Sequence, residues 1–85
     1  MGKLLHLPNI SRELEAKLLA VGIDSPELLR EKGSRNVFVK IKTIDSSACY
    51  LMLLSLEGAI QGLLSDDLDQ QTVNELMEFM EIFNQ

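Results

Sequence analysis

The chain has 85 residues, 46% of them hydrophobic and 25% charged, a size and composition typical of one soluble globular domain. Its single cysteine, Cys49, excludes an intrachain disulfide and favours a reducing compartment. The apolar stretch 48–64 contains Glu57 and Gln61 and is at or below the shortest bilayer span, so we expect a buried helix there and no membrane segment. No signal peptide is recognisable, and a cytoplasmic location is expected.

Charge is divided unevenly along the chain, whose net charge is −5. Residues 1–42 contain all eight bases and five acids, a net charge of +3, whereas residues 43–85 contain eight acids and no base, a net charge of −8. Such asymmetry favours an electrostatic partner or head-to-tail self-association. A solvated surface with unevenly placed charges is the alternative.

The first two predicted helices have clear boundaries. Ser11 is the expected cap of the first helix, and Gly22 is suited to the left-handed conformation that ends it. The apolar side of this helix comprises Leu14, Leu18, Leu19 and Val21. Ser25 is the expected cap of a short second helix that begins at Pro26 and ends at Gly33.

Residues 34–44 are ambiguous between strand and helix. Alternation from Val37 to Lys42 fits a strand, but no other segment alternates and offers a pairing partner. The large apolar residues also fall on one helical face, namely Val37, Phe38, Ile41 and Ile44. Because Ser34 is also a good cap residue, we predict a helix here.

Asp45 is the expected cap of the longest helix, over residues 46–64, at the centre of the fold. Its bulky apolar face comprises Cys49, Met52, Leu53, Leu56, Ile60 and Leu63, so that Cys49 is expected to be buried. Its small-residue face comprises Ala48, Ser55, Gly58, Ala59 and Gly62. A glycine inside a helix costs about 1 kcal/mol relative to alanine. The two glycines therefore predict the close approach of another helix, first within the fold and second in a dimer.

The last predicted helix follows a turn at residues 65–67 and is capped by Asp69. Its inward stripe comprises Val73, Leu76, Met77, Met80 and Phe83. Phe79 lies at the edge of that stripe, and Ile82 lies on the polar side beside two glutamates. An acidic helix with spare apolar surface is suited to docking on a partner, and a frayed terminus is the alternative.

The predicted elements make an all-α, compact five-helix bundle in a single domain, residues 1–85. No catalytic constellation is visible, because His6 is the only histidine and no histidine neighbours Cys49 in the sequence. The aspartates at 66–69 lack the ligand spacing and the closing glutamate of a calcium loop. We therefore expect no enzyme, metal, cofactor or small-molecule substrate.

The segment LPNISRELEAKLLAVGI, residues 7–23, resembles the second half of a helix-hairpin-helix motif. In that family a Leu-Pro-Gly-Ile-Gly hairpin holds a DNA phosphate at a helix N-terminus. Asn9 and Ser11 stand where the glycines would be, and asparagine tolerates the positive φ of such a turn. The DNA contact that this resemblance implies uses Asn9, Ile10, Ser11, Arg12, Lys17, Lys40 and Lys42.

A broader resemblance rests on the segments LPNIS, RELEAKL, DSPELL, KGSRNVFVKIK and LEGAIQG. These segments, between Leu4 and Leu68, resemble the C-terminal domain of the TfoX (Sxy) family of bacterial competence regulators. The resemblance implies a small helical bundle related to the helix-hairpin-helix and SAM-like folds, here as a stand-alone domain. Leu63, Leu64 and Ser65 stand where that family often has an aromatic residue.

Two functions are compatible with these observations. The first is a small, non-enzymatic helical module for regulation or protein interaction, acting as a homodimer or as a docking partner. Its predicted surface comprises Ser55, Gly58, Ala59, Gly62, Phe79 and Ile82. The second is weak, sequence-nonspecific DNA binding by the hairpin, which the net charge of −5 disfavours because phosphate neutralisation supplies most nonspecific affinity.

Overall fold

The computed structural model describes residues 3–84, which form an all-α fold with no strand in that range. The five α-helices are α1 (Arg12–Ala20), α2 (Pro26–Lys32), α3 (Ser34–Ile44), α4 (Tyr50–Gln61) and α5 (Gln70–Phe83). Two short 3-10 helices are η1 (Leu4–His6) and η2 (Ser65–Asp67). The all-α prediction with five helices is confirmed, whereas the relation to helix-hairpin-helix and SAM-like folds stays a prediction.

The predicted serine caps begin α1 and α2. The Oγ of Ser11 accepts a hydrogen bond from the amide of Leu14 at 3.2 Å, and the Oγ of Ser25 accepts one from the amide of Leu28 at 3.1 Å. Each hydroxyl satisfies one of the amides that the first turn of a helix leaves without a partner. Gly33, with a φ of +83°, separates α2 from α3 as the sequence predicts.

The apolar side of α1 is narrower than the sequence suggests. Leu14 and Leu18 are buried, but Leu19 is 50% exposed, which corrects its predicted inward position. Helix α1 packs mainly on η1 and α3. Gly22 follows the helix with a φ of +86°, as predicted.

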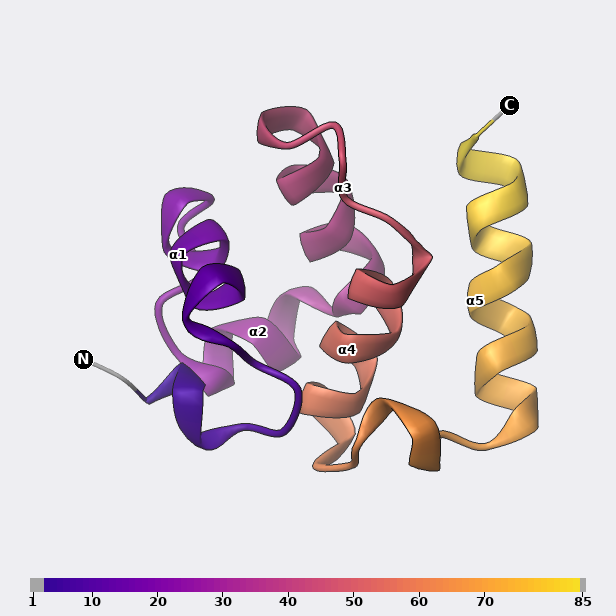
Figure 1. Cartoon of the computed structure of the whole chain (residues 1–85), viewed down its shortest axis with the longest axis horizontal. Helices are drawn as coiled ribbons and strands as arrows, with labels where there is room; N and C mark the ends of the chain where they lie inside the picture. The colour runs from indigo at the N-terminus through magenta and orange to yellow at the C-terminus, as the bar shows by residue number, and fades with distance from the viewer. Residues whose placement is uncertain (1–2, 85) are drawn as a thin grey trace.

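Residues 34–44 are helical, and the strand alternative is wrong. Ser34 does not cap α3, because it is the first helical residue and its hydroxyl donates to Glu57 of α4 instead. Ile44 is 55% exposed, although it shares a helical face with the buried Ile41. Ile44 is the last residue of α3, and the last turn of that helix extends beyond the start of α4 (Figure 1).

Helix α4 is shorter than predicted at both ends. Asp45 does not cap it, because Oδ1 of Asp45 accepts hydrogen bonds from the amide and hydroxyl of Ser47. Cys49 is the cap residue and is exposed, which corrects its predicted burial. Gly62, with a φ of +77°, ends the helix in the left-handed conformation. The 14-residue α5, rather than the 12-residue α4, is therefore the longest helix.

Helix α5 begins at its predicted cap. The Oδ1 of Asp69 accepts a hydrogen bond from the amide of Thr72 at 2.7 Å. Leu76 is buried, and the ring of Phe83 meets Phe38 of α3 edge to face, with centroids 5.9 Å apart. Met77 is 47% exposed, so that its predicted inward position is corrected.

Helix α4 is the centre of the fold, because α2, α3, η2 and α5 all pack on it. Figure 1 shows α5 along one edge of the molecule and α1 near the opposite edge. The core contains buried residues from η1 and every α-helix, including Leu4, Leu18, Leu29, Phe38, Ile41, Leu53, Leu56 and Leu76. Among the described residues, no helix combines the length and apolarity needed to cross a membrane.

Candidate functional site

The hairpin before α1 turns at Asn9, whose φ is +70°. The Nδ2 of Asn9 donates to the carbonyl oxygen of Leu63 at 2.9 Å and to that of Ser55 at 3.4 Å. The Oδ1 of Asn9 accepts a hydrogen bond from the amide of Ser65 at 3.1 Å. The hairpin has the predicted shape, but its central side chain is bonded to the middle of α4 and to two residues after that helix.

The residues next to Asn9 divide between core and surface. Ile10 is buried in the core, and the Oγ of Ser11 accepts the capping hydrogen bond of α1. Arg12 is exposed at the first position of that helix. Arg12 is therefore the predicted phosphate contact of the hairpin whose side chain remains available to solvent.

Two of the three predicted phosphate-binding lysines are bonded within the protein. The Nζ of Lys17 lies 2.6 Å from Oδ2 of Asp45 and 3.1 Å from Oε1 of Glu13. The Nζ of Lys42 donates to the carbonyl oxygens of Ser46 and Ala48, both at 2.7 Å. Lys40 is exposed on α3 and forms no ion pair among the residues described.

The Lys17–Asp45 pair joins α1 to the connection between α3 and α4. The hydrogen bond from Lys17, followed by the hydroxyl and amide of Ser47, lowers the pKa of Asp45 from 3.8 to about 2. The same pair, with a contribution from Glu13, raises the pKa of Lys17 above its usual value. Both shifts favour the charged forms, so the pair is a structural link near neutral pH.

The hairpin packs against the small-residue face of α4. A methyl group added at Gly58 would lie 2.5 Å from Nδ2 of Asn9 and 2.6 Å from the carbonyl oxygen of Leu63. The sequence predicts another helix at this position, but the structure places a side chain and the turn after α4 there. Ala59 is buried, Ser55 accepts the long bond from Asn9, and Gly62 is the left-handed end residue. The space beside Gly58 is therefore filled by residues of the same chain.

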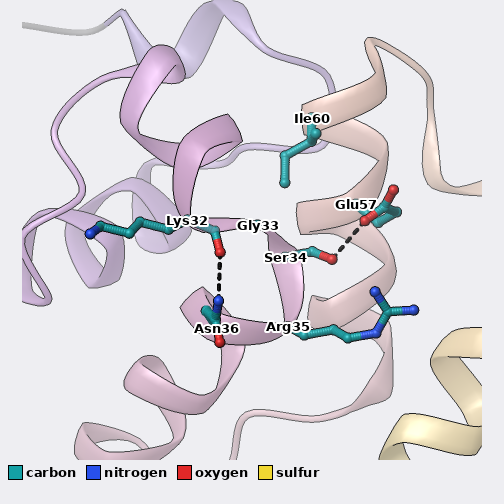
Figure 2. A pocket seen from close by; sticks show the side chains of 7 residues that line it. All are labelled: Lys32, Gly33, Ser34, Arg35, Asn36, Glu57 and Ile60. Atoms are coloured by element: carbon teal, nitrogen blue, oxygen red, sulfur yellow. Dashed lines mark hydrogen bonds between the residues drawn. The ribbon is translucent and has the colours of Figure 1, made fainter.

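A hollow of about 340 Å³ lies where α2 meets α3, beside α4. Figure 2 shows the residues that line it, Lys32, Gly33, Ser34, Arg35, Asn36, Glu57 and Ile60. The buried hydroxyl of Ser34 donates to Oε1 of Glu57 at 2.6 Å, and Gln61 donates to the other carboxylate oxygen. The Glu57 carboxylate therefore lies beside the N-terminus of α3, where a negative charge is stabilising.

A second hollow, of about 220 Å³, lies between the start of α4 and α5. Its lining comprises Tyr50, Met77, Met80, Glu81 and Asn84. The hydroxyl of Tyr50 donates to the carbonyl oxygen of Val73 at 3.3 Å, which directs the polar end of the ring to the α5 backbone. The exposed part of the hollow is therefore mostly apolar, with Glu81 and Asn84 as its polar residues.

The two other apolar residues predicted on the surface of α5 differ in exposure. Phe79 is half-buried, and its ring stacks on Phe83 with centroids 5.8 Å apart. Ile82 is 71% exposed. Neither residue lines the hollow beside Tyr50, so α5 presents apolar surface on more than one side.

The groups with chemical reactivity are dispersed. His6 and Cys49 are both exposed and lie in η1 and at the start of α4, respectively. Within residues 3–84, no group of three or more His, Cys, Asp or Glu side chains is arranged to hold a metal ion.

One family model matches residues 1–80, that of the TfoX C-terminal domain. The chain belongs to the TfoX C-terminal domain family. The match covers every helix described above except the last residues of α5. The resemblance inferred from LPNIS and LEGAIQG is thereby confirmed. A search of the curated proteins gives no match.

Two crystal structures are similar to this TfoX C-terminal domain. An uncharacterised protein from Listeria monocytogenes, in a triclinic form, is 40% identical with a TM-score of 0.93 and covers 95% of this chain and 92% of its own. A protein of unknown function from Listeria monocytogenes, in a tetragonal form, is 40% identical with a TM-score of 0.91 and covers 94% of this chain and 98% of its own. Both likenesses support a small helical module.

Two features of this TfoX C-terminal domain are not predictable from the motifs of the sequence. One is the Ser34–Glu57 bond, for which a glutamate on a mostly apolar helix was the available signal. The other is the hollow beside α5, for which Tyr50 was the signal, because the hydroxyl of a partly buried tyrosine requires a partner. In both cases the residue type indicated a bond, and the partner lay 23 residues away in the sequence.

Proposed function

We propose that the chain is a non-enzymatic helical module that regulates by binding protein, and that it docks its partner at the hollow between Tyr50 and α5. The single observation that carries this proposal is an open apolar hollow whose rim includes Met77, 47% exposed. Methionine adapts its shape to different partners and is common at such binding surfaces. Family membership supports a regulatory role, which in this proposal is exerted through protein contact.

The hairpin also favours protein binding over DNA binding, because most of its predicted phosphate contacts are not available. The polar atoms of Asn9, Ser11 and Lys17 are bonded within the fold, and the whole chain has a net charge of −5. Nonspecific DNA affinity depends on neutralising phosphates. The exposed Arg12 at the start of α1 favours DNA binding as the second candidate, because a helix N-terminus with a nearby cation attracts phosphate.

Site-specific photocrosslinking in cells that express the chain tests the proposal. A benzophenone amino acid replaces Asn84, at the rim of the hollow, and in a control replaces Glu75, on the other side of α5 by helical geometry. We expect a discrete protein adduct from position 84 that is lost with Glu81→Lys, and none from position 75. Absence of a protein adduct at position 84, or equal adducts at both positions, would contradict the proposal.

A further inference from the structure

The hollow beside α5 is large enough for one aliphatic side chain of another molecule. Its volume is about 220 Å³, and an apolar cavity of about 150 Å³ is known to hold a benzene molecule. Tyr50, Met77 and Met80 supply the apolar lining. The occupant should therefore present an exposed branched or straight aliphatic residue on a protruding element.

The charge around the hollow restricts the occupant further. Residues 43–85 contain eight acids and no base, and α5 itself contains Glu75, Glu78 and Glu81. Glu81 lines the hollow, and no lysine or arginine of α4 or α5 compensates it. Complementarity therefore calls for a cation close to the inserted aliphatic residue.

The end of α3 in this chain has both features, an exposed aliphatic residue and a cation beside it. From Lys32 to Ile44 the sequence contains four bases and no acid. Lys40 is exposed and forms no ion pair among residues 3–84, and Ile44 is 55% exposed. Residues four apart on a helix are surface neighbours, so Lys40 and Ile44 form one patch. Leu19, exposed on α1, has no such partner, because the nearby Lys17 is bonded to Asp45 and Glu13.

We propose that the hollow binds a second copy of the chain, with Ile44 of that copy inserted between Tyr50 and Met77 and its Lys40 facing Glu81. This inference rests on the proposed function and names the partner for the same hollow. The two patches are different surfaces, so the contact is either repeated head to tail or made reciprocally in a two-fold dimer. In both arrangements each contact joins one basic patch to one acidic hollow.

Sedimentation velocity of the purified chain over a range of protein concentrations tests this contact. We expect concentration-dependent association that weakens as salt is raised, because the charges are at the rim of the contact. Lys40→Glu and Glu81→Lys should each weaken association about tenfold. An equimolar mixture of the two variants should recover it, because every contact between one variant and the other pairs opposite charges. Ile44→Ser, which leaves the charge unchanged, should weaken association as well.

The matched control is Glu75→Lys, which changes the charge of α5 by the same amount on its far side. If only net repulsion between acidic chains governed association, both Glu81→Lys and Glu75→Lys would strengthen it. Equal effects of these two variants, or no recovery in the mixture, would overturn the inference. A parent chain that is monomeric at every concentration would also overturn it. In that case, a photocrosslink from position 84 to a different protein would leave the proposed function standing.

Discussion

The hairpin and α5 use their chemically distinctive residues in opposite ways. At the hairpin, the polar side chain of Asn9 is bonded to three backbone groups, one in the middle of α4 and two after that helix. Along α5, apolar side chains such as Met77 and Ile82 remain exposed. The polar hairpin residue predicted to contact a ligand therefore stabilises the fold. The apolar residues of α5, which are of the type usually found in a core, are available for contact with a partner.

This difference follows from what each position can satisfy internally. A backbone carbonyl or amide near the end of a helix needs a partner, and a nearby asparagine can supply both a donor and an acceptor. The side chain of Met77 needs no hydrogen-bond partner, so the free-energy cost of its exposure comes only from the apolar area that stays in contact with water. Polar residue type alone is therefore a weak guide to the binding surface of this fold.

The largest effect that we predict is at Asn9. Replacing it with alanine removes its hydrogen bonds, each worth about 1 kcal/mol, and places alanine at a φ of +70°, which costs roughly a further 1–2 kcal/mol. We expect Asn9→Ala to lower the free energy of unfolding by about 3–5 kcal/mol in urea denaturation, the lower figure applying if the long bond to Ser55 contributes little. Asn9→Gly keeps the backbone conformation and should lose less. Equal losses for the two variants would show that backbone conformation contributes nothing.

The next effect concerns Gly58, beneath Asn9. Alanine gains about 1 kcal/mol of helix propensity, but its methyl group would meet a side-chain nitrogen at 2.5 Å and a backbone oxygen at 2.6 Å. We expect Gly58→Ala to destabilise the chain by about 1–3 kcal/mol, as overpacking does. The loss in the double variant with Asn9→Ala should be smaller than the sum of the single losses, since one clash is removed. A stabilised Gly58→Ala would contradict the close approach.

A smaller effect is expected from the pair of Lys17 and Asp45. The pKa of Asp45 in the fold, about 2, is below its ordinary value of 3.8. The pair therefore stabilises the fold fully above about pH 4, and this stabilisation is lost as the pH falls towards 2. Asp45→Asn should flatten this part of the stability profile in acid denaturation. Some acid sensitivity should persist, because the amide of Thr72 lowers the pKa of Asp69 as well.

The smallest effect on stability is predicted at the exposed end of α3. Ile44→Ser should change the free energy of unfolding by less than about 0.5 kcal/mol, because surface substitutions away from packed features have small effects. Thermal unfolding of the dilute chain measures this change. A loss comparable to that of Gly58→Ala would show that Ile44 packs in the core and is unavailable to a partner.

The sequence predicts the local features of this fold well. The caps at Ser11, Ser25 and Asp69 bond to amides three residues later, so residue type and spacing are sufficient. Positive φ at Asn9 and Gly22 also follows from residue type, whereas Gly62, which the sequence places inside α4, ends that helix with a positive φ. Such features depend on interactions within one turn of the chain.

The two wrong cap predictions involve residues with a partner that is distant in sequence. Asp45 and Ser34 both have the residue type of a cap, but Asp45 faces Lys17 and Ser34 donates to Glu57. The predicted hairpin has the right shape, yet the bonds from Asn9 span 46 to 56 residues. The direction of these side chains depends on how the helices pack, which periodicity and spacing do not specify.

The most direct measurement of the difference between the two regions is an anisotropy titration of a short labelled DNA duplex with the parent chain at low salt. We predict no saturable binding, because Asn9, Ser11 and Lys17 are bonded within the fold and the net charge is −5. Saturable binding that weakens with salt and disappears with Arg12→Glu would contradict this prediction. It would show that the hairpin holds phosphate and that DNA, rather than protein, is the ligand of this domain.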